Sequence, residues 1–223
     1  MEAYVIYIEG HEDSEKFSDR CVQSIIDTES DLDIIKFPAI TPDNMWKVNY
    51  TWPLRKKRLC EKTNLLLSAY KTYDNNKRIA AAQSHYMLWR KCLTLNKPIL
   101  ILEHDAIFIK KFDMNIMEWW PGEGAISINN PIGATFGSKE YDEKLQNGIN
   151  EVPWLVDRNI PQGLPGNSAY VLYPDAAREL IRLQDEIGWW PNDAIMCKQL
   201  CPWIRCYKPY LTKCQGIKST TSK

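Results

Sequence analysis

The chain has 223 residues, 44% of them hydrophobic and 25% charged, so it can bury a core without disulfides or structural metals. Its formal net charge is zero, with 28 basic and 28 acidic residues, and no overall field draws it to nucleic acid or an anionic membrane. No stretch approaches the roughly 20 apolar residues that cross a bilayer, and no signal peptide is expected. The cysteines have no tight framework, which indicates reduced thiols in a cytoplasm.

The first elements predict the start of a parallel sheet. A strand over 4–8, a helix over 14–27 and a strand over 34–37 form a βαβ unit. Residues 40–60 have no clear periodicity and predict an irregular loop beside a functional site.

A helical pair is expected next, with one helix ending near Tyr73 and a second over 77–95. In the second helix, apolar residues and His85 recur with helical spacing and form one face of an amphipathic helix. A strand over 99–102, a short helix after residue 105 and a strand over 125–128 follow.

The remaining residues close the same domain. Residues 129–167, rich in Gly, Pro and Asn, predict a second irregular active-site loop. The closing elements are a strand over 169–173, a helix over 175–186, a short helix after Pro191 and a strand over 204–207. The pattern predicts a single α/β domain over residues 1–223.

Two acids follow the apolar run that predicts a buried central strand. Ile99 to Leu102 has the length and branching of such a strand, and Glu103 and Asp105 stand at its carboxyl end. Ligands bind at this edge of open α/β sheets, and neighbouring carboxylates there require a cation or a proton. Because Mg²⁺ or Mn²⁺ suits such oxygen ligands, the run predicts a metal-held nucleotide-diphosphate site. The alternative is that the acids cap a turn or pair with a lysine such as Lys110.

Other candidate groups stand near this edge in the expected fold. Ser84 and His85 lie on a helix just before the strand, where His85 is either a core histidine or a group that orients a phosphate or an acid. Strand alternation points His104 away from the two acids. The segment 166–168 is either a plain turn or a loop that lets the backbone approach a ligand.

An acid near the C-terminus is the candidate general base. Asp193 follows Trp189 and Trp190 at the start of a short helix, where it either stabilises the helix dipole or accepts the proton of an incoming hydroxyl. Tryptophan pairs, which include Trp119 and Trp120, usually pack in the core, although some line clefts that bind sugars or bases.

Two clusters have a plain and a functional interpretation. One is a set of cysteines whose spacing argues against a zinc site, namely Cys197, Cys201, Cys206 and Cys214. The other is a basic run beside Tyr50 and Trp52, a solvated loop or a grip on donor or nucleic-acid phosphates, namely Arg55, Lys56, Lys57 and Arg58.

Taken in chain order, these segments resemble glycosyltransferase family 25, the lipooligosaccharide-type and collagen-type galactosyltransferase group. The resemblance runs through residues 4–8, 81–89, 99–105, 166–177 and 191–193. Its most specific part is the helix with Ser84, His85 and Trp89, followed by the apolar strand and its acids.

The resemblance implies a GT-A-like (Rossmann-type) α/β fold with a central, mostly parallel sheet, a nucleotide-sugar donor, a divalent metal and inversion at the anomeric carbon. It implies Glu103 and Asp105 as ligands of Mn²⁺ or Mg²⁺, and Asp193 and His85 as catalytic residues. The expected donor-binding residues are Ile8, Ser84, Glu103, Gly166, Asn167 and Ser168. The family's usual Glu-Asp-Asp run has His104 in the middle here, but alternation makes the outer acids the co-facing pair, so we expect the metal site to persist.

The acceptor stays open between two classes. With UDP as the expected donor nucleotide, a bacterial surface glycan and a hydroxymethylated base of viral or phage DNA both fit a short family member. The basic run beside aromatic residues favours DNA, whereas the zero net charge argues against it. A rival function is a non-catalytic nucleic-acid- or carbohydrate-binding module on a decayed transferase fold, with His104 as a sign of decay. A metal-dependent nuclease or phosphatase would need more acidic ligands than this edge offers.

Overall fold

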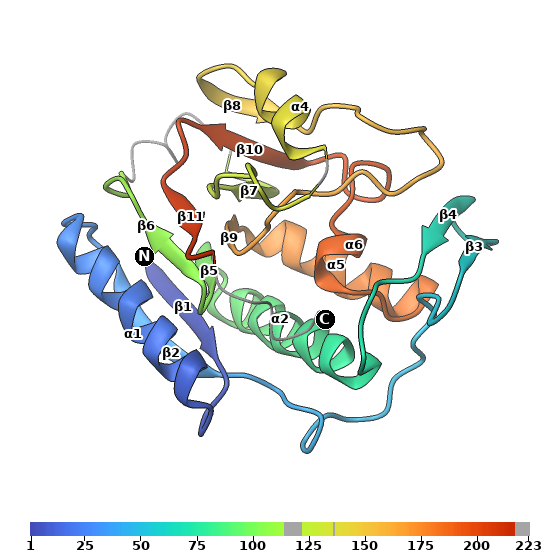
Figure 1. Cartoon of the computed structure of the whole chain (residues 1–223), viewed down its shortest axis with the longest axis horizontal. Helices are drawn as coiled ribbons and strands as arrows, with labels where there is room; N and C mark the ends of the chain where they lie inside the picture. Colours follow the sequence, from blue (N-terminus) through green and yellow to red (C-terminus); the bar gives the residue numbers. More distant parts are fainter. Residues whose placement is uncertain (114–121, 136, 217–223) are drawn as a thin grey trace.

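The structure is a computed structural model that describes residues 1–113, 122–135 and 137–216. A seven-stranded sheet with the strand order β2-β1-β5-β9-β7-β10-β8 runs through the molecule (Figure 1). The described elements are β1 (Glu2–Tyr7), α1 (Glu12–Asp27), β2 (Asp33–Pro38), β3 (Lys57–Cys60), β4 (Leu65–Ser68), α2 (Asn75–Leu95), β5 (Ile99–Glu103), β6 (Ala106–Phe108), β7 (Ala125–Ser127), α4 (Ser138–Glu143), β8 (Gly148–Glu151), β9 (Ala169–Leu172), α5 (Pro174–Ile187), α6 (Asn192–Ile195), β10 (Ile204–Lys208) and β11 (Thr212–Cys214).

The central sheet is mostly parallel, with a reversal in its middle. Strand β1 pairs in parallel with β2 and β5, and β7 pairs in parallel with β10. Strand β9 runs antiparallel to β5 and β7, its neighbours on either side, and β8 runs antiparallel to β10. The expected α/β class, the mostly parallel sheet and the central place of β5 are therefore confirmed.

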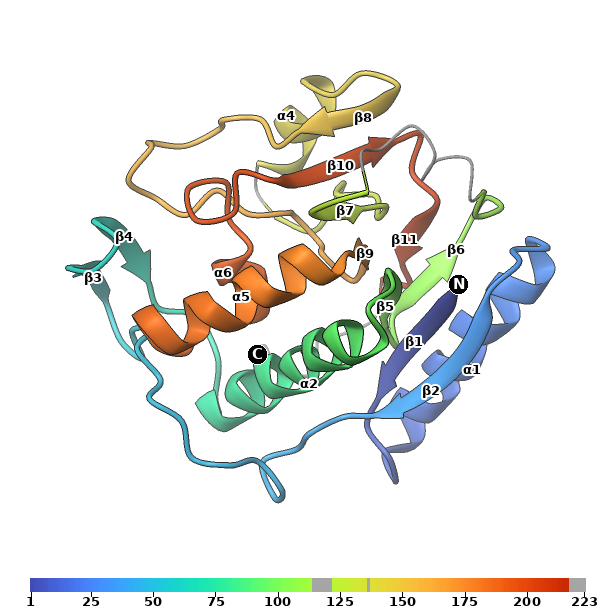
Figure 2. The same cartoon turned by 180° about the vertical axis from the view of Figure 1, so that it is seen from behind.

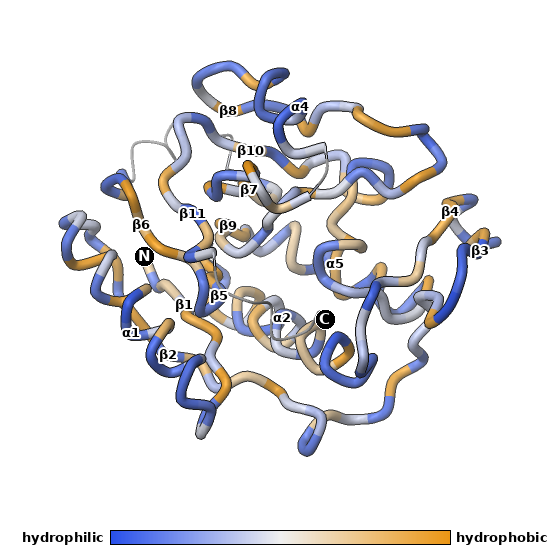
Figure 3. Tube along the Cα trace, in the orientation of Figure 1, coloured by the Kyte–Doolittle hydropathy of each residue, from blue (hydrophilic) through white to orange (hydrophobic). Residues whose placement is uncertain are grey.

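Two apolar cores lie on the two faces of this sheet. Ile99 and Ile101 of β5 belong to the core covered by α2 and α5, whereas Leu100 and Leu102 belong to the core covered by α1. Figure 2 shows α2 and α5 side by side, and Figure 3 shows the hydrophobic stretch of β1 beside α1. All four of these β5 side chains are fully buried, and burial of each contributes about 1.5–3 kcal/mol. Burial of these side chains on both faces holds β5 in the centre of the sheet and so sets the position of the acids at its end.

The prediction of a first helix ending near Tyr73 is wrong. Strands β3 and β4 form an antiparallel hairpin there, with Leu59 opposite Leu66. Leu65 and Leu67 are buried while Leu66 between them is half-buried, which is the alternation of a strand. The pattern of a run of three leucines does not distinguish a helix from a strand. Leu65 and Leu67 pack into the core as alternate residues of a strand. The second helix is confirmed as α2.

Strands β6 and β11 were not expected. They pair with each other in a separate two-stranded sheet, and β6 occupies the start of the segment for which a short helix was predicted. Trp119 and Trp120 lie outside the described residues. Gln215, just after β11, donates its backbone N–H to the carbonyl of Asp105 at 2.8 Å, so the C-terminal part of the chain returns to the acids.

The two expected loops contain some regular structure. Residues 129–167 include α4 and β8, and β3 begins near the end of 40–60. Within the part of the chain that the structure describes, no helix has the length and apolar character needed to cross a membrane.

Candidate active site

A cleft of about 1910 Å³ opens at the carboxyl ends of β1, β2 and β5. The residues that line it come from distant parts of the sequence, from β1 to β11. Every residue expected to bind donor or metal or to act in catalysis lies along it: Ile8, Ser84, His85, Glu103, Asp105, Gly166, Asn167, Ser168 and Asp193. The structure therefore brings the predicted set together, while the role of each residue stays a prediction.

The segment 166–168 reaches the cleft because β9 is reversed. Glu103 donates its backbone N–H to the carbonyl of Ser168 at 2.8 Å, which fixes this segment beside the end of β5. Gly166 has φ +60°, and a Cβ there would lie 2.8 Å from the Cβ of Ala134. Glycine is thus required at this position both for its backbone conformation and for the space.

The two acids have opposite electrostatic environments. Burial raises the pKa of Glu103, but the hydrogen bond from His85 and the charges of His85 and His104 together outweigh this effect, so the net pKa is lowered. For Asp105, burial and then the charge of Glu103 raise the pKa from 3.8 to about 7. Among the described residues, the buried Oδ1 of Asp105 has no hydrogen-bond partner. An unsatisfied carboxylate oxygen next to a second carboxylate favours a cation between them.

The expectation that His104 points away from the acids is wrong. Strand β5 ends at Glu103, and residues 104–105 form a turn, so strand alternation does not extend to His104. His104 lines the same cleft as the acids. Burial lowers the pKa of His104, the charge of Glu103 raises it, and His11 lowers it, with a net decrease.

His85, on α2, forms a hydrogen bond with Glu103 at the end of β5. Its Nε2 lies 3.2 Å from Oε1 of Glu103, and its Nδ1 lies 2.8 Å from the hydroxyl of Tyr170. The hydroxyl of Tyr170 also accepts the indole N–H of Trp89 at 3.0 Å. His85 is thus both a hydrogen-bonded core histidine and a group in contact with an acid, the two interpretations that the sequence left open.

Asp193, in the first turn of α6, lines the same cleft as the two acids. The hydroxyl of Tyr70 donates to its Oδ1 at 3.1 Å, and the guanidinium of Arg78 lies over the Tyr70 ring, 4.2 Å from the centroid. Burial raises the pKa of Asp193, and Arg78 and the Tyr70 hydrogen bond only partly offset this. A carboxylate with a raised pKa that is still open to the cleft is a stronger base than an ordinary aspartate.

Two of the expected donor-binding residues already have structural hydrogen bonds. The hydroxyl of Ser84 accepts the backbone N–H of Ile40 at 2.8 Å and donates to the carbonyl of Ala80 at 3.0 Å. The backbone N–H of Ile8 donates to the hydroxyl of Ser14 at 2.8 Å. These bonds hold the loops after β2 and β1 in place along the cleft.

The basic run does not line the cleft, and of the four C-terminal cysteines Cys214 alone does. Arg55 to Arg58 are exposed on the β3–β4 hairpin and are not among the residues that line the cleft, although Leu66 and Ser68 of the same hairpin are. No group of three or more His, Cys, Asp or Glu side chains suited to a metal occurs in the described ranges.

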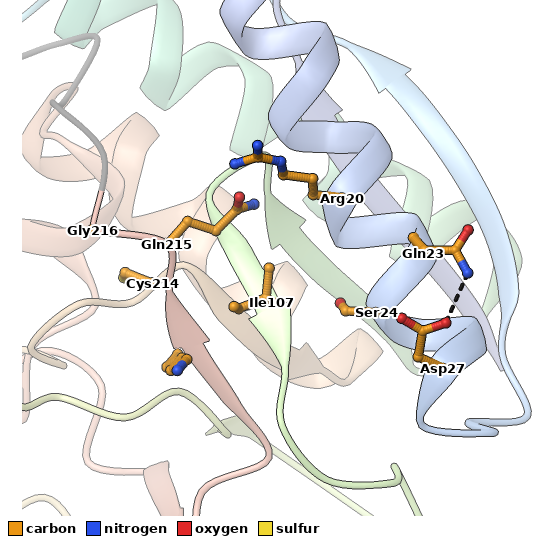
Figure 4. Close-up of a pocket in the computed structure, with 9 residues that line it drawn as sticks. Arg20, Gln23, Ser24, Asp27, Ile107, Cys214, Gln215 and Gly216 are labelled. Carbon is orange, nitrogen blue, oxygen red and sulfur yellow. Dashed lines mark hydrogen bonds between the residues drawn. The ribbon is translucent and has the colours of Figure 1, made fainter.

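A second, smaller hollow of about 530 Å³ lies between α1 and the β6–β11 pair (Figure 4). Arg20, Gln23 and Asp27 of α1 line one side of it, and Gln23 donates to Asp27 at 2.8 Å. Cys214 lines both hollows, but none of the expected site residues lines the smaller one.

Sequence reasoning missed the partners of the site residues. Tyr170 and Trp89 lie within segments that carried the family resemblance, and Trp89 follows His85 by one helical turn, so the helical spacing was an available signal. Tyr70 comes after β4, where no pattern pointed to Asp193. Cys214, whose Sγ lies 3.1 Å from the hydroxyl of Ser168, belongs to a strand that was not expected.

The fold and the cleft define an α/β protein with an acid pair and a separate raised-pKa acid at the carboxyl edge of its sheet. Residues 20–196 match the family described as glycosyltransferase family 25 (LPS biosynthesis protein), and the chain belongs to this family. A comparison with curated proteins finds no match. Among solved structures, the chain is similar to mouse xyloside xylosyltransferase 1 in its apo form, at 8% identity over 89% of this chain and 79% of that chain, with a TM-score of 0.41.

Proposed function

We propose that this glycosyltransferase moves a sugar from a nucleoside-diphosphate donor to a hydroxyl of a saccharide, with inversion and with a divalent cation. The observation that carries the proposal is the convergence of Glu103, Asp105 and Asp193 on one cleft from distant parts of the chain. Family membership supports the nucleotide-sugar donor and the glycan acceptor.

The acid pair is suited to a divalent cation. Asp105 offers a buried oxygen without a hydrogen-bond partner among the described residues, and Glu103 is held with a lowered pKa beside it. Glu103 and Asp105 would hold Mn²⁺ or Mg²⁺, whose positive charge would stabilise the departing diphosphate as a Lewis acid. The donor phosphates and water would complete the ligand set, because two carboxylates alone do not fill an octahedral site.

The protein's own groups supply the rest of the chemistry. Asp193 accepts the proton of the acceptor hydroxyl, for which its raised pKa and open position are suitable. Gly166 lets the backbone of 166–168 approach the donor closely. Asn167 is buried beside the cleft, and its side-chain oxygen lacks a hydrogen-bond partner within the described chain, so it can accept from a donor hydroxyl.

The acceptor side of the cleft favours a saccharide over a DNA base. Trp52, Tyr70 and Tyr73 line the cleft, and the ring of Tyr73, which is 82% exposed, is of the kind that stacks on sugar rings. The basic residues of the β3–β4 hairpin lie outside it. A Lys56→Glu, Lys57→Glu double variant should therefore leave donor hydrolysis and transfer to saccharides unchanged. A loss of transfer in that variant, together with salt-sensitive retention of the unaltered protein on DNA, would instead support the DNA acceptor.

The first test is the melting temperature with UDP, Mn²⁺, or both. Binding at about 100-fold over Kd adds about 2.7 kcal/mol, which for this chain length raises Tm by about 5–10 °C. We expect a shift that requires both ligands and that Asp105→Asn abolishes. No shift with any nucleoside diphosphate, and no hydrolysis of nucleotide sugars, would favour the non-catalytic binding module.

A further inference from the structure

A chain of buried hydrogen bonds ends on Glu103. The indole N–H of Trp89 reaches the hydroxyl of Tyr170 at 3.0 Å, that hydroxyl lies 2.8 Å from Nδ1 of His85, and Nε2 of His85 lies 3.2 Å from Oε1 of Glu103. Trp89 and Tyr170 are fully buried, and His85 is 2% exposed. The rings of His85 and Tyr170 are stacked, with their planes 15° apart. The ring orientation of His85 is therefore fixed on both sides.

The chain has a direction because its first member can only donate. An indole N–H has no acceptor capacity, so the oxygen of Tyr170 accepts from Trp89. The phenol proton must then go to another acceptor, and within the described residues the acceptor in reach is Nδ1 of His85. Nδ1 therefore carries no proton, Nε2 carries one, and the Nε2–H donates to Glu103.

We propose that Trp89 and Tyr170 are positioning residues that hold His85 as its Nε2–H tautomer, so that His85 orients the Glu103 carboxylate toward the cleft. The choice of Glu103 as the group to be oriented rests on the proposed function. Partners of this kind around metal-binding carboxylates fix the geometry of the ligand. Both nitrogens of His85 are engaged in this arrangement, which leaves Asp193 as the acid that takes the acceptor proton.

Stability alone does not explain this chain. The same face of the sheet carries Ile101 and Leu172, and apolar side chains of similar volume would fill the space without polar atoms. A buried polar network stabilises a core less than good apolar packing unless each of its members is satisfied. Here the chain is satisfied from Trp89 to Glu103, and its last acceptor is the carboxylate at the cleft.

The tautomer can be measured directly by ¹⁵N NMR on the full chain labelled at histidine, at one neutral pH and without metal. The chain contains 3 histidines, so His11→Gln and His104→Gln variants assign the signals of His85. In the unaltered protein we expect Nδ1 far downfield as an unprotonated nitrogen and Nε2 as a protonated one. An Nδ1–H tautomer or a doubly protonated ring would overturn the proposal, and no variant of the network is needed for that result.

A pair of tyrosine variants then tests the effect on Glu103. Tyr170→Phe removes the acceptor of the Trp89 N–H and the donor to His85, whereas Tyr141→Phe alters an equally buried tyrosine that does not line the cleft. Tyr170→Phe should produce a mixture of His85 tautomers and weaken Mn²⁺ binding in the presence of UDP by about 10–100-fold, and Tyr141→Phe should do neither. Equal Mn²⁺ affinity in both variants would overturn the proposal.

If Tyr170→Phe does not fold, Trp89→Phe removes only the first donor and gives the same two readouts in weaker form. Failure of the unaltered protein to bind Mn²⁺ at all would overturn the metal part of the proposed function. The tautomer of His85 would still decide the hydrogen-bonded chain, because it is measured without metal.

Discussion

The metal-free protein should lose stability as the pH rises through the titration of Asp105, and the substitution Asp105→Asn should abolish this loss. Burial, and then the charge of Glu103, raises the pKa of Asp105 from 3.8 to about 7. Between these values the unfolded chain has released the proton that the folded chain still holds, so folding stability from this group falls as the pH rises and levels off above about 7. The slope is about 1.4 kcal/mol per pH unit, or about 4 kcal/mol over the whole window.

The assay is urea unfolding of the unaltered protein and of Asp105→Asn, in EDTA, at pH 5 and pH 7.5. The free energy of unfolding of the variant relative to the unaltered protein should rise by about 2–3 kcal/mol between these pH values. Other ionisable groups contribute to both proteins and largely cancel in the difference. A difference that stays constant within about 0.5 kcal/mol, or that changes in the opposite direction, would refute the raised pKa and the electrostatic argument for a cation. With Mn²⁺ and UDP added, the unaltered protein alone should gain stability.

Two further predictions concern the base and the turn that leads to it. In Tyr70→Phe, loss of the hydrogen bond that partly offsets the burial of Asp193 should move the acid limb of the pH profile of kcat/KM to higher pH, and an unmoved limb would argue against Asp193 as the base. Gly188→Ala should lower the free energy of unfolding by about 3 kcal/mol or more, because its φ is +90° and the new Cβ would collide with Thr51. Gly133→Ala, at φ +89° in open space, should cost only about 1–2 kcal/mol, and equal urea midpoints would contradict the steric argument.

The sequence was sufficient where local pattern and burial agree. The apolar run of β5 and the acids after it follow from a short strand that is buried on both faces, and the helical spacing around His85 follows from one buried face of α2. The β3–β4 hairpin could not be predicted in this way, because Leu65 to Leu67 fit a helix or a strand equally well. The prediction for His104 was wrong for a related reason. Side chains alternate only while the strand continues, and β5 ends at Glu103, one residue before His104.

The reversal of β9 is the fact on which the site depends most and which the sequence shows least. Gly166 to Ser168 precede their strand, and in a fully parallel sheet a segment that precedes a strand lies at the edge opposite to Glu103. Because β9 runs antiparallel to β5, with Ala169 opposite Leu102, this segment lies at the carboxyl end of β5 instead. The same pairing places Tyr170 opposite Ile101, on the face covered by α2, where it meets His85. Alternation of apolar residues is identical for the two strand directions, so no local pattern could reveal that one reversal positions both the glycine segment and the tyrosine.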